Sequence, residues 1–278
     1  FGALSDKYGS GKASLLGILL VIISLFWMAN IQGPFGIIAS QTIFGLGSAG
    51  CGTAVVLGAV GRSVQSSNRT LSLGIVMAAG SFGQFMMVPI ISYLIEILGW
   101  SKSLTLLAFV AAIMIIFSFF INYSQSSESS KIGTKQSLKE AIVEAFQSKS
   151  FNLLSLGFFV CGFHVTFVAV HLPAFVEDQN LPFWVGGWAL AFIGIFNVLG
   201  TIYFGYLGDR LSKKNLLALL YSLRGLLFLI FIFLPKTELT VLVFACLLGI
   251  LWLSTVPLTS GLISVVFGPY YMSMLYGW

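Results

Sequence analysis

The sequence has few charged residues and few cysteines, and both scarcities exclude classes of protein. Charged side chains make up 8% of the 278 residues, whereas a soluble domain has about 25%. The chain therefore lacks the charge that a water-facing surface needs. Its three cysteines lie inside apolar runs without metal-ligand spacing, which argues against a disulfide scaffold and a metal centre. We expect no metal and no cofactor.

Long apolar runs take the place of the missing charge, because 58% of the residues are hydrophobic. A helix rises about 1.5 Å per residue, so a run of about 20 apolar residues crosses the hydrocarbon of a bilayer. We predict an all-α polytopic membrane protein. Its eight predicted spans are 13–31, 34–60, 71–98, 103–122, 151–175, 184–208, 215–234 and 238–267.

The basic residues predict the orientation of these spans. Eleven of the fourteen fall in alternate loops and only two in the opposite loops. Loops rich in Lys and Arg face the cytoplasm. We therefore predict a multi-pass plasma-membrane protein whose net charge of +5 reflects its orientation in the lipid bilayer, with no nucleic-acid partner. The eleven are Lys7, Lys12, Arg62, Arg69, Lys131, Lys135, Lys139, Lys149, Arg210, Lys213 and Lys214.

Residues 123–150 form the one long connection, which is rich in Ser and Lys and predicted to be cytoplasmic. Ser137 and Glu140 have the spacing of a helix capping box, and the residues after them have one apolar face. We predict a short amphipathic helix that lies on the membrane surface. A helix that binds a partner protein is the alternative.

Two segments of the chain repeat one pattern, Phe-Gly-x-Leu-x-Asp followed by basic residues, at 1–12 and 204–214. Internal repeats in membrane proteins indicate structurally related halves. We predict an incomplete N-terminal half at 1–122 and an incomplete C-terminal half at 151–278. The positions of the copies predict twelve spans in two pseudo-symmetric six-helix halves, of which eight are present here.

The repeated segments resemble the signature of the major facilitator superfamily, Gly-x-x-x-Asp-(Arg/Lys)-x-Gly-x-(Arg/Lys)-(Arg/Lys). The first copy matches at Gly2, Asp6, Lys7, Gly9 and Lys12, and the second at Gly205, Asp209, Arg210 and Lys214. Gly11, Ser212 and Asn215 depart from the signature. The resemblance implies a major-facilitator-type bundle and secondary transport by alternating access. It also implies a cytoplasmic gating role for the matching residues.

Residues 69–84, RTLSLGIVMAAGSFGQ, resemble the fifth span of the monocarboxylate and oxalate–formate branch of that family. This resemblance implies a small organic anion, such as a monocarboxylate, as the substrate. Proton-coupled members of the branch carry an Asp and Arg pair in the eighth span. Here the span 184–208 has no charge, and an Arg appears one span later. The coupling mechanism is therefore expected to differ.

Arg224 is the only charged residue deep inside a predicted span. It is the tenth residue of 215–234 and so lies near the midplane of the membrane. An Arg at this depth costs about 2.5–3.5 kcal/mol on insertion scales. A guanidinium suits a carboxylate through two parallel hydrogen bonds, which makes Arg224 the first candidate for a substrate contact. Pairing with main-chain carbonyls or with another helix is the alternative.

Other polar residues inside the spans are weaker candidates for substrate or coupling contacts. His164 and His171 share one helix face, and each could link transport to protons or simply be hydrogen-bonded in the interior. Asn197, Gln41 and Gln84 could bind substrate or hold two helices together. Thr255 and Thr259 flank Pro257 and predict a kink that serves a gate.

The glycine-rich run at 45–52 contains Gly-x-Gly-x-x-Gly, the spacing of a dinucleotide-binding fingerprint. That fingerprint needs a preceding strand and an aqueous phosphate site, whereas this run lies inside an apolar span. We predict that the face of Gln41, Gly45, Ser48 and Gly52 permits close helix packing or lines a cavity.

The function predicted from the sequence is secondary transport, and we expect no enzyme. His-Glu-x-x-His, Gly-x-Ser-x-Gly and paired intramembrane acids do not occur in the sequence. The expected partners are a small-molecule substrate, a coupled proton or counter-anion, and the lipid bilayer, with the protein a monomer. The alternatives are transport of another small solute and a non-transporting membrane sensor with the same fold.

Overall fold

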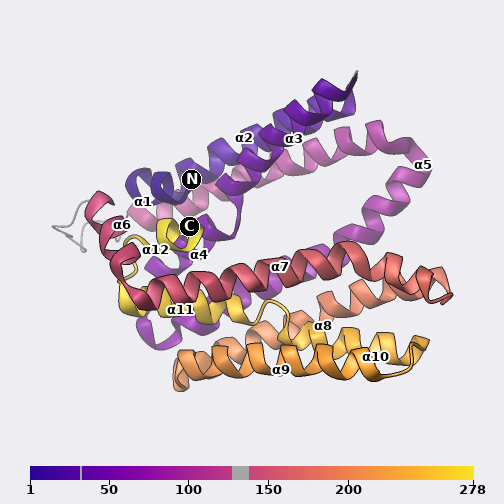
Figure 1. The fold of residues 1–278 in the computed structure, drawn as a ribbon. Helices are drawn as coiled ribbons and strands as arrows, with labels where there is room; N and C mark the ends of the chain where they lie inside the picture. Colours follow the sequence, from indigo (N-terminus) through magenta and orange to yellow (C-terminus); the bar gives the residue numbers. More distant parts are fainter. Residues whose placement is uncertain (32, 127–137) are drawn as a thin grey trace. The chain divides into compact units, whose positions relative to one another are not determined.

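The computed structural model describes residues 1–31, 33–126 and 138–278 (Figure 1). Every regular element in these ranges is a helix, which confirms the predicted all-α class. The elements are α1 (Gly2–Tyr8), α2 (Ser10–Ala29), α3 (Gly33–Cys51), α4 (Thr53–Ser63), η1 (Ser66–Asn68), α5 (Arg69–Ser126), α6 (Leu138–Gln147), α7 (Lys149–Asp178), α8 (Phe183–Arg210), α9 (Lys213–Phe233), α10 (Glu238–Leu251), α11 (Thr255–Val266) and α12 (Met272–Gly277).

Eight segments of the described chain are long and apolar enough to cross a membrane, as predicted. Large apolar side chains on their outer faces are exposed, as the 71% exposure of Phe159 illustrates. Such surfaces suit a hydrocarbon environment. The segments are Ser10–Ala29, Gly33–Ser63, Ser66–Met87, Tyr93–Phe119, Lys149–Asp178, Trp184–Arg210, Lys213–Phe233 and Glu238–Val266.

The helices differ from the predicted spans at three places. A break at Gly52 divides the predicted span 34–60 into α3 and α4, and a second break at residues 252–254 divides 238–267 into α10 and α11. By contrast, α5 covers two predicted spans. Gly99 turns the chain between them with φ 76° and ψ 164°, a conformation that glycine adopts without a Cβ clash.

The predicted amphipathic helix is present as α6. Ala141 and Ala145 on its apolar side are buried, and Glu140 lies in its first turn. Ser137, the other half of the predicted capping box, lies outside the described residues.

The chain forms two compact units, each assembled from separate stretches of sequence. The first unit comprises Phe1–Val64, Met87–Ala145 and Ile263–Trp278, and the second comprises Gln65–Met86 and Phe146–Leu262. The division into halves at 1–122 and 151–278, inferred from the internal repeat, stays a prediction.

In the first unit, α2 and α3 pack closely along their lengths. A Cβ on Gly47 would lie 2.7 Å from the Val21 nitrogen, and one on Gly17 would lie 2.7 Å from the Cys51 nitrogen. The glycine-rich run therefore contains a helix-packing surface. Gly47 belongs to that surface, whereas a Cβ on Gly45 would meet nothing within 4 Å. The packing face is therefore offset from the predicted one.

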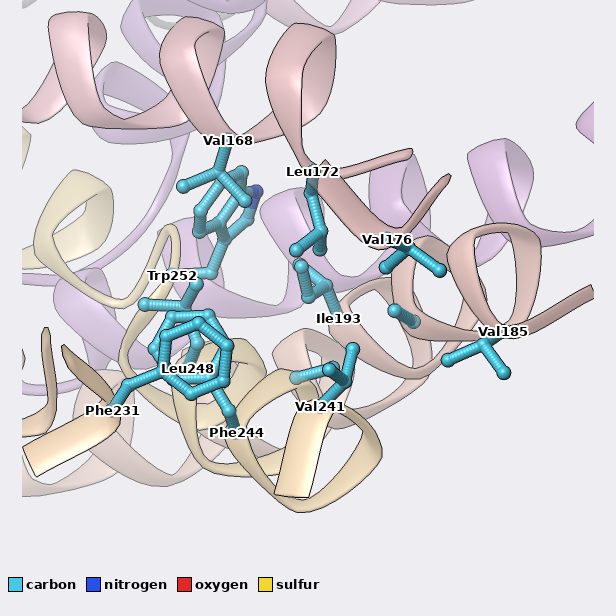
Figure 2. Packing of buried hydrophobic residues seen from close by; sticks show 12 residues of the cluster. Val168, Leu172, Val176, Val185, Ile193, Phe231, Val241, Phe244, Leu248 and Trp252 are labelled. Carbon is cyan, nitrogen blue, oxygen red and sulfur yellow. The ribbon is translucent and has the colours of Figure 1, made fainter. Parts of the chain in front are cut away.

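The second unit has its main apolar core between α7, α8, α9 and α10 (Figure 2). The stacked rings of Phe231 and Phe244, with centroids 4.0 Å apart, join α9 to α10. Trp252 lies in the same cluster, directly after α10, so the core anchors one side of the break between α10 and α11. Its other buried members are Val168, Leu172, Val176, Val185, Ala189, Ile193, Val241, Ala245 and Leu248.

The close contact of α8 with α10 in the second unit is expected to be sensitive to one added methyl group. A Cβ on Gly200 would lie 2.1 Å from the Ile250 carbonyl oxygen, and a main-chain atom gives way poorly. Gly200→Ala should therefore lower the free energy of unfolding by about 1–3 kcal/mol. The measurement is thermal unfolding in detergent. The matched control is Gly225→Ala on α9, where nothing lies within 4 Å. Equal unfolding temperatures for the two variants would contradict the predicted packing.

Candidate functional site

The break between α10 and α11 forms the centre of the candidate site. α10 ends at Leu251, and Pro257 is the third residue of α11. Proline has no N–H to donate to the carbonyl four residues earlier, but it is tolerated in the first turn of a helix. The predicted kink therefore lies at 252–254, just before Pro257. The break leaves main-chain groups of α10 without helical partners.

Arg224 of α9 binds the carbonyl end of α10. Its side chain is fully buried, and Nη2 donates to the carbonyl oxygens of Leu251 and Trp252. Nη1 donates to the Cys161 Sγ at 3.4 Å. The Tyr221 ring lies under the guanidinium, 5.7 Å from its centroid. A cation at a helix C-terminus interacts favourably with the helix dipole, so the break and the guanidinium stabilise each other.

The positive charge of Arg224 is not matched by a carboxylate in the described chain. The ion pair found there joins Asp6 and Arg62 in the first unit. The Nε of Arg224 is buried and has no hydrogen-bond partner. A buried charge without a counter-charge is costly. The arrangement therefore combines an unused N–H donor with a local excess of positive charge.

Asn197 of α8 holds the same break from a second direction. It is 1% exposed, and its Oδ1 accepts a hydrogen bond of 2.8 Å from the Leu253 N–H. Its Nδ2 donates to the Ser81 Oγ on α5 at 2.6 Å. The structure therefore brings two predicted candidates, Arg224 and Asn197, to neighbouring peptide groups of one broken helix.

His164 lies next to this cluster, whereas His171 does not belong to it. His164 is half-buried and close enough to Arg224 for the two to repel when both are protonated. Its ring lies 5.5 Å from that of Phe228, and its Nδ1 is buried without a hydrogen-bond partner. His171 is exposed and contacts the ring of Phe167.

The two glutamine candidates also lie outside the cluster. Gln84 of α5 is exposed. Gln41 is exposed in the first unit, where its Nε2 donates to the Met28 Sδ at 3.1 Å. Of the six predicted substrate or coupling residues, three therefore gather at the break in the second unit: Arg224, Asn197 and His164.

The second copy of the repeated motif joins the end of α8 to the start of α5. Asp209 accepts hydrogen bonds from the main-chain nitrogens of Thr70 and Leu71, at 2.9 and 2.8 Å. These two N–H groups lie in the first turn of α5, where helical N–H groups lack partners. A Cβ on Gly205 would lie 3.0 Å from the Thr70 carbonyl oxygen. The repeated glycine thus permits the approach that the repeated aspartate completes.

The first copy makes the corresponding contact in the first unit. Asp6 accepts a 2.7 Å hydrogen bond from the Met274 nitrogen, at the start of α12, and pairs with Arg62. A Cβ on Gly2 would lie 2.3 Å from the Ser273 carbonyl oxygen. Burial raises the pKa of the Asp6 carboxyl although Arg62 and the Met274 N–H lower it. The pair therefore fixes geometry more than it adds stability.

The other residues of the motif divide into a backbone position and a charged surface. Gly9 has φ 97°, which favours glycine, whereas the Ser212 that replaces it in the second copy has φ −62°. The departure from the signature therefore follows a different backbone conformation. The four basic residues of the motif are exposed, namely Lys7, Lys12, Arg210 and Lys214.

Several partners in these networks were not predicted from the sequence. In the sequence, Arg62 indicates only the orientation of the spans, and Cys161 is only a small apolar residue inside a span. Tyr221 carried a usable signal, because it precedes Arg224 by three residues and so lies on the same side of α9. The main-chain partners at 251–253 carried no signal in the sequence.

Loss of the Asp209 carboxylate should uncap α5. Asp209→Ala removes both acceptors for the Thr70 and Leu71 N–H groups, so these amides should exchange hydrogen faster and unfolding should cost about 0.5–2 kcal/mol less. The control is Asp178→Ala at the C-terminal end of α7, which should change stability by less than about 0.5 kcal/mol. Unchanged exchange at residues 70 and 71 would contradict the capping role.

Comparisons with known proteins agree with the helical membrane fold and with the family resemblance. The sequence model of the Major Facilitator Superfamily matches residues 1–278. The sialic acid transporter NanX of Escherichia coli K12 is 21% identical over 91% of this chain and 62% of its own length. The uncharacterized MFS-type transporter YcxA of Bacillus subtilis 168 is 26% identical over 71% of this chain and 50% of its own. The MFS-type transporter pynF of Aspergillus niger is 20% identical over 78% and 49%.

The chain thus spans about half to three-fifths of the length of these relatives. Because the family match extends over all of its residues, the chain belongs to the Major Facilitator Superfamily.

Proposed function

We propose that the protein is a secondary transporter that works by alternating access and binds a small organic anion through Arg224. One observation carries the anion assignment. The guanidinium is fully buried at a broken membrane helix, and the described residues supply it with no carboxylate. Membership of the family and the transporter relatives support the transport function.

The position of the guanidinium suits a substrate site. Arg224 lies near the middle of α9, and discontinuous helices near the membrane midplane form the binding sites of many transporters. A carboxylate would bring the missing negative charge and accept the unused Nε–H. The anion would therefore offset the cost of the buried cation, and the cation would select for acids over neutral solutes.

One of the relatives favours an acid as the substrate. The Escherichia coli relative is named as a transporter of sialic acid. The resemblance of residues 69–84 favours a smaller acid of the monocarboxylate and oxalate–formate branch, and this branch assignment stays a prediction. Both substrate classes carry the carboxylate that a guanidinium recognises.

The remaining groups fit a transport cycle in which the halves at 1–122 and 151–278 move as bodies. His164 beside Arg224 is the favoured group for a coupled proton, with a counter-anion as the other possibility. Asp6 and Asp209 would hold helix ends together at the cytoplasmic side in one state of the cycle. A monomer in the plasma membrane completes the proposal.

Uptake into liposomes tests the role of Arg224. The purified protein is reconstituted and assayed with radiolabelled sialic acid, lactate and a neutral sugar. Arg224→Ala should reduce uptake of the transported acid about tenfold or more, because a hydrogen-bonded charge is lost. Arg224→Lys should retain part of the uptake, since it keeps the charge without the planar fork.

Lys236→Ala is the matched control. Lys236 also donates to main-chain carbonyls at a helix end, those of Phe231 and Ile232 on α9, but it lies between the spans Lys213–Phe233 and Glu238–Val266. Acid uptake by the Lys236→Ala variant should equal that of the wild type. Equal acid uptake by the wild type and Arg224→Ala would refute the anion site. Uptake of the neutral sugar without either acid would show that the substrate is not an organic anion.

A further inference from the structure

We infer that a carboxylate bound bidentately by Arg224 loosens the break between α10 and α11, because it must take an N–H group from a helix carbonyl. This inference rests on the proposed function and concerns how the same site is coupled to a change of shape. It follows from the hydrogen-bond donors that the guanidinium has and from those already in use.

A guanidinium has five N–H donors in a fixed plane, one on Nε and two on each Nη. In the structure, Nη2 donates to two carbonyl oxygens, those of Leu251 and Trp252. Nη1 donates once, to Cys161, and Nε donates to no acceptor. The two unused N–H groups therefore belong to different nitrogens, Nε and Nη1.

The two unused donors do not form a fork. A carboxylate binds a guanidinium bidentately either through Nε and Nη2 on one edge or through both Nη atoms at the end. Both edges include Nη2, and both of its donors hold carbonyls of the break. Bidentate binding therefore displaces at least one of the carbonyl oxygens of Leu251 and Trp252.

The consequence for the helix differs between its two attachments. Asn197 binds the N–H of Leu253, not a carbonyl, so an anion leaves that contact in place. The displaced carbonyl loses a charged donor inside a region without water, where few replacements exist. The segment 251–254 then stays tied to α8 through Asn197 but is released from α9, which frees α10 and α11 to move against α9.

Coupling of this kind works in both directions. If the anion favours release of α10 from Arg224 by some factor, the released state must bind the anion more tightly than the held state by the same factor. Nη2 has only two N–H donors, and the substrate and the α10 carbonyls compete for them. The break therefore forms a latch that the substrate itself opens, with Asn197 as its fixed end.

Hydrogen–deuterium exchange tests this latch in the reconstituted wild-type protein. Exchange is compared with and without saturating sialic acid or lactate, and bound radiolabelled ligand is measured by equilibrium dialysis of the same sample. The amides of Trp252 and Val256 should exchange about tenfold faster with ligand, as expected for loss of a hydrogen bond to a charged group, whereas the Leu253 amide, which Asn197 holds, should not change. The capped amides of Thr70 and Leu71 serve as the internal control and should not change.

The outcomes separate this inference from the proposed function. Ligand binding with unchanged exchange at residues 252 and 256 would overturn the latch and leave the anion site standing. Failure of both acids to bind the wild type would overturn both. Arg224→Lys offers one ammonium instead of a fork, so ligand should no longer accelerate exchange there. Equal acceleration in this variant would also refute the latch.

Discussion

A membrane helix must satisfy its main-chain hydrogen bonds without water, and the rest of this structure depends on that constraint. Most helices meet it internally. The break at 252–254 does not, because helical hydrogen bonding is interrupted before Pro257. Arg224 donates hydrogen bonds to the carbonyls that lack helical partners, and Asn197 accepts one from the Leu253 N–H, which also lacks a helical partner. Two polar side chains that are costly in hydrocarbon thus complete a helix that would otherwise be more costly.

The same constraint explains the repeated motif at the helix ends. The first turn of a helix has N–H groups without helical partners, and Asp209 binds two of them at the start of α5. Asp6 binds the corresponding group at Met274. In both copies the glycine four residues earlier allows the partner backbone to come close. The glycine and the aspartate of the motif therefore act as one unit.

The sequence allowed much of the fold and part of the site to be predicted. Apolar run lengths gave all eight spans, since crossing a bilayer fixes a minimum length. The cost of a charge in hydrocarbon singled out Arg224, and the repeat singled out Asp6 and Asp209. The role of Arg224 as a helix cap was only an alternative. His171 and Gln84 were candidates because they are polar and lie inside predicted spans, but both are exposed in the structure. Helical periodicity does not say which face of a helix meets a neighbour.

By itself, the sequence determined which side chains are too polar for their surroundings and therefore need partners. Only the tertiary structure decided what those partners are. Arg224 binds carbonyls 27 and 28 residues away, and Asp209 binds nitrogens 138 and 139 residues away. Every residue has a carbonyl and nearly every residue has an N–H group, so the identity of a residue carries no signal that its main chain will be used. The packing of the helices decides which main-chain groups come within reach, and both sets lack helical partners: one at the break after α10 and the other in the first turn of α5.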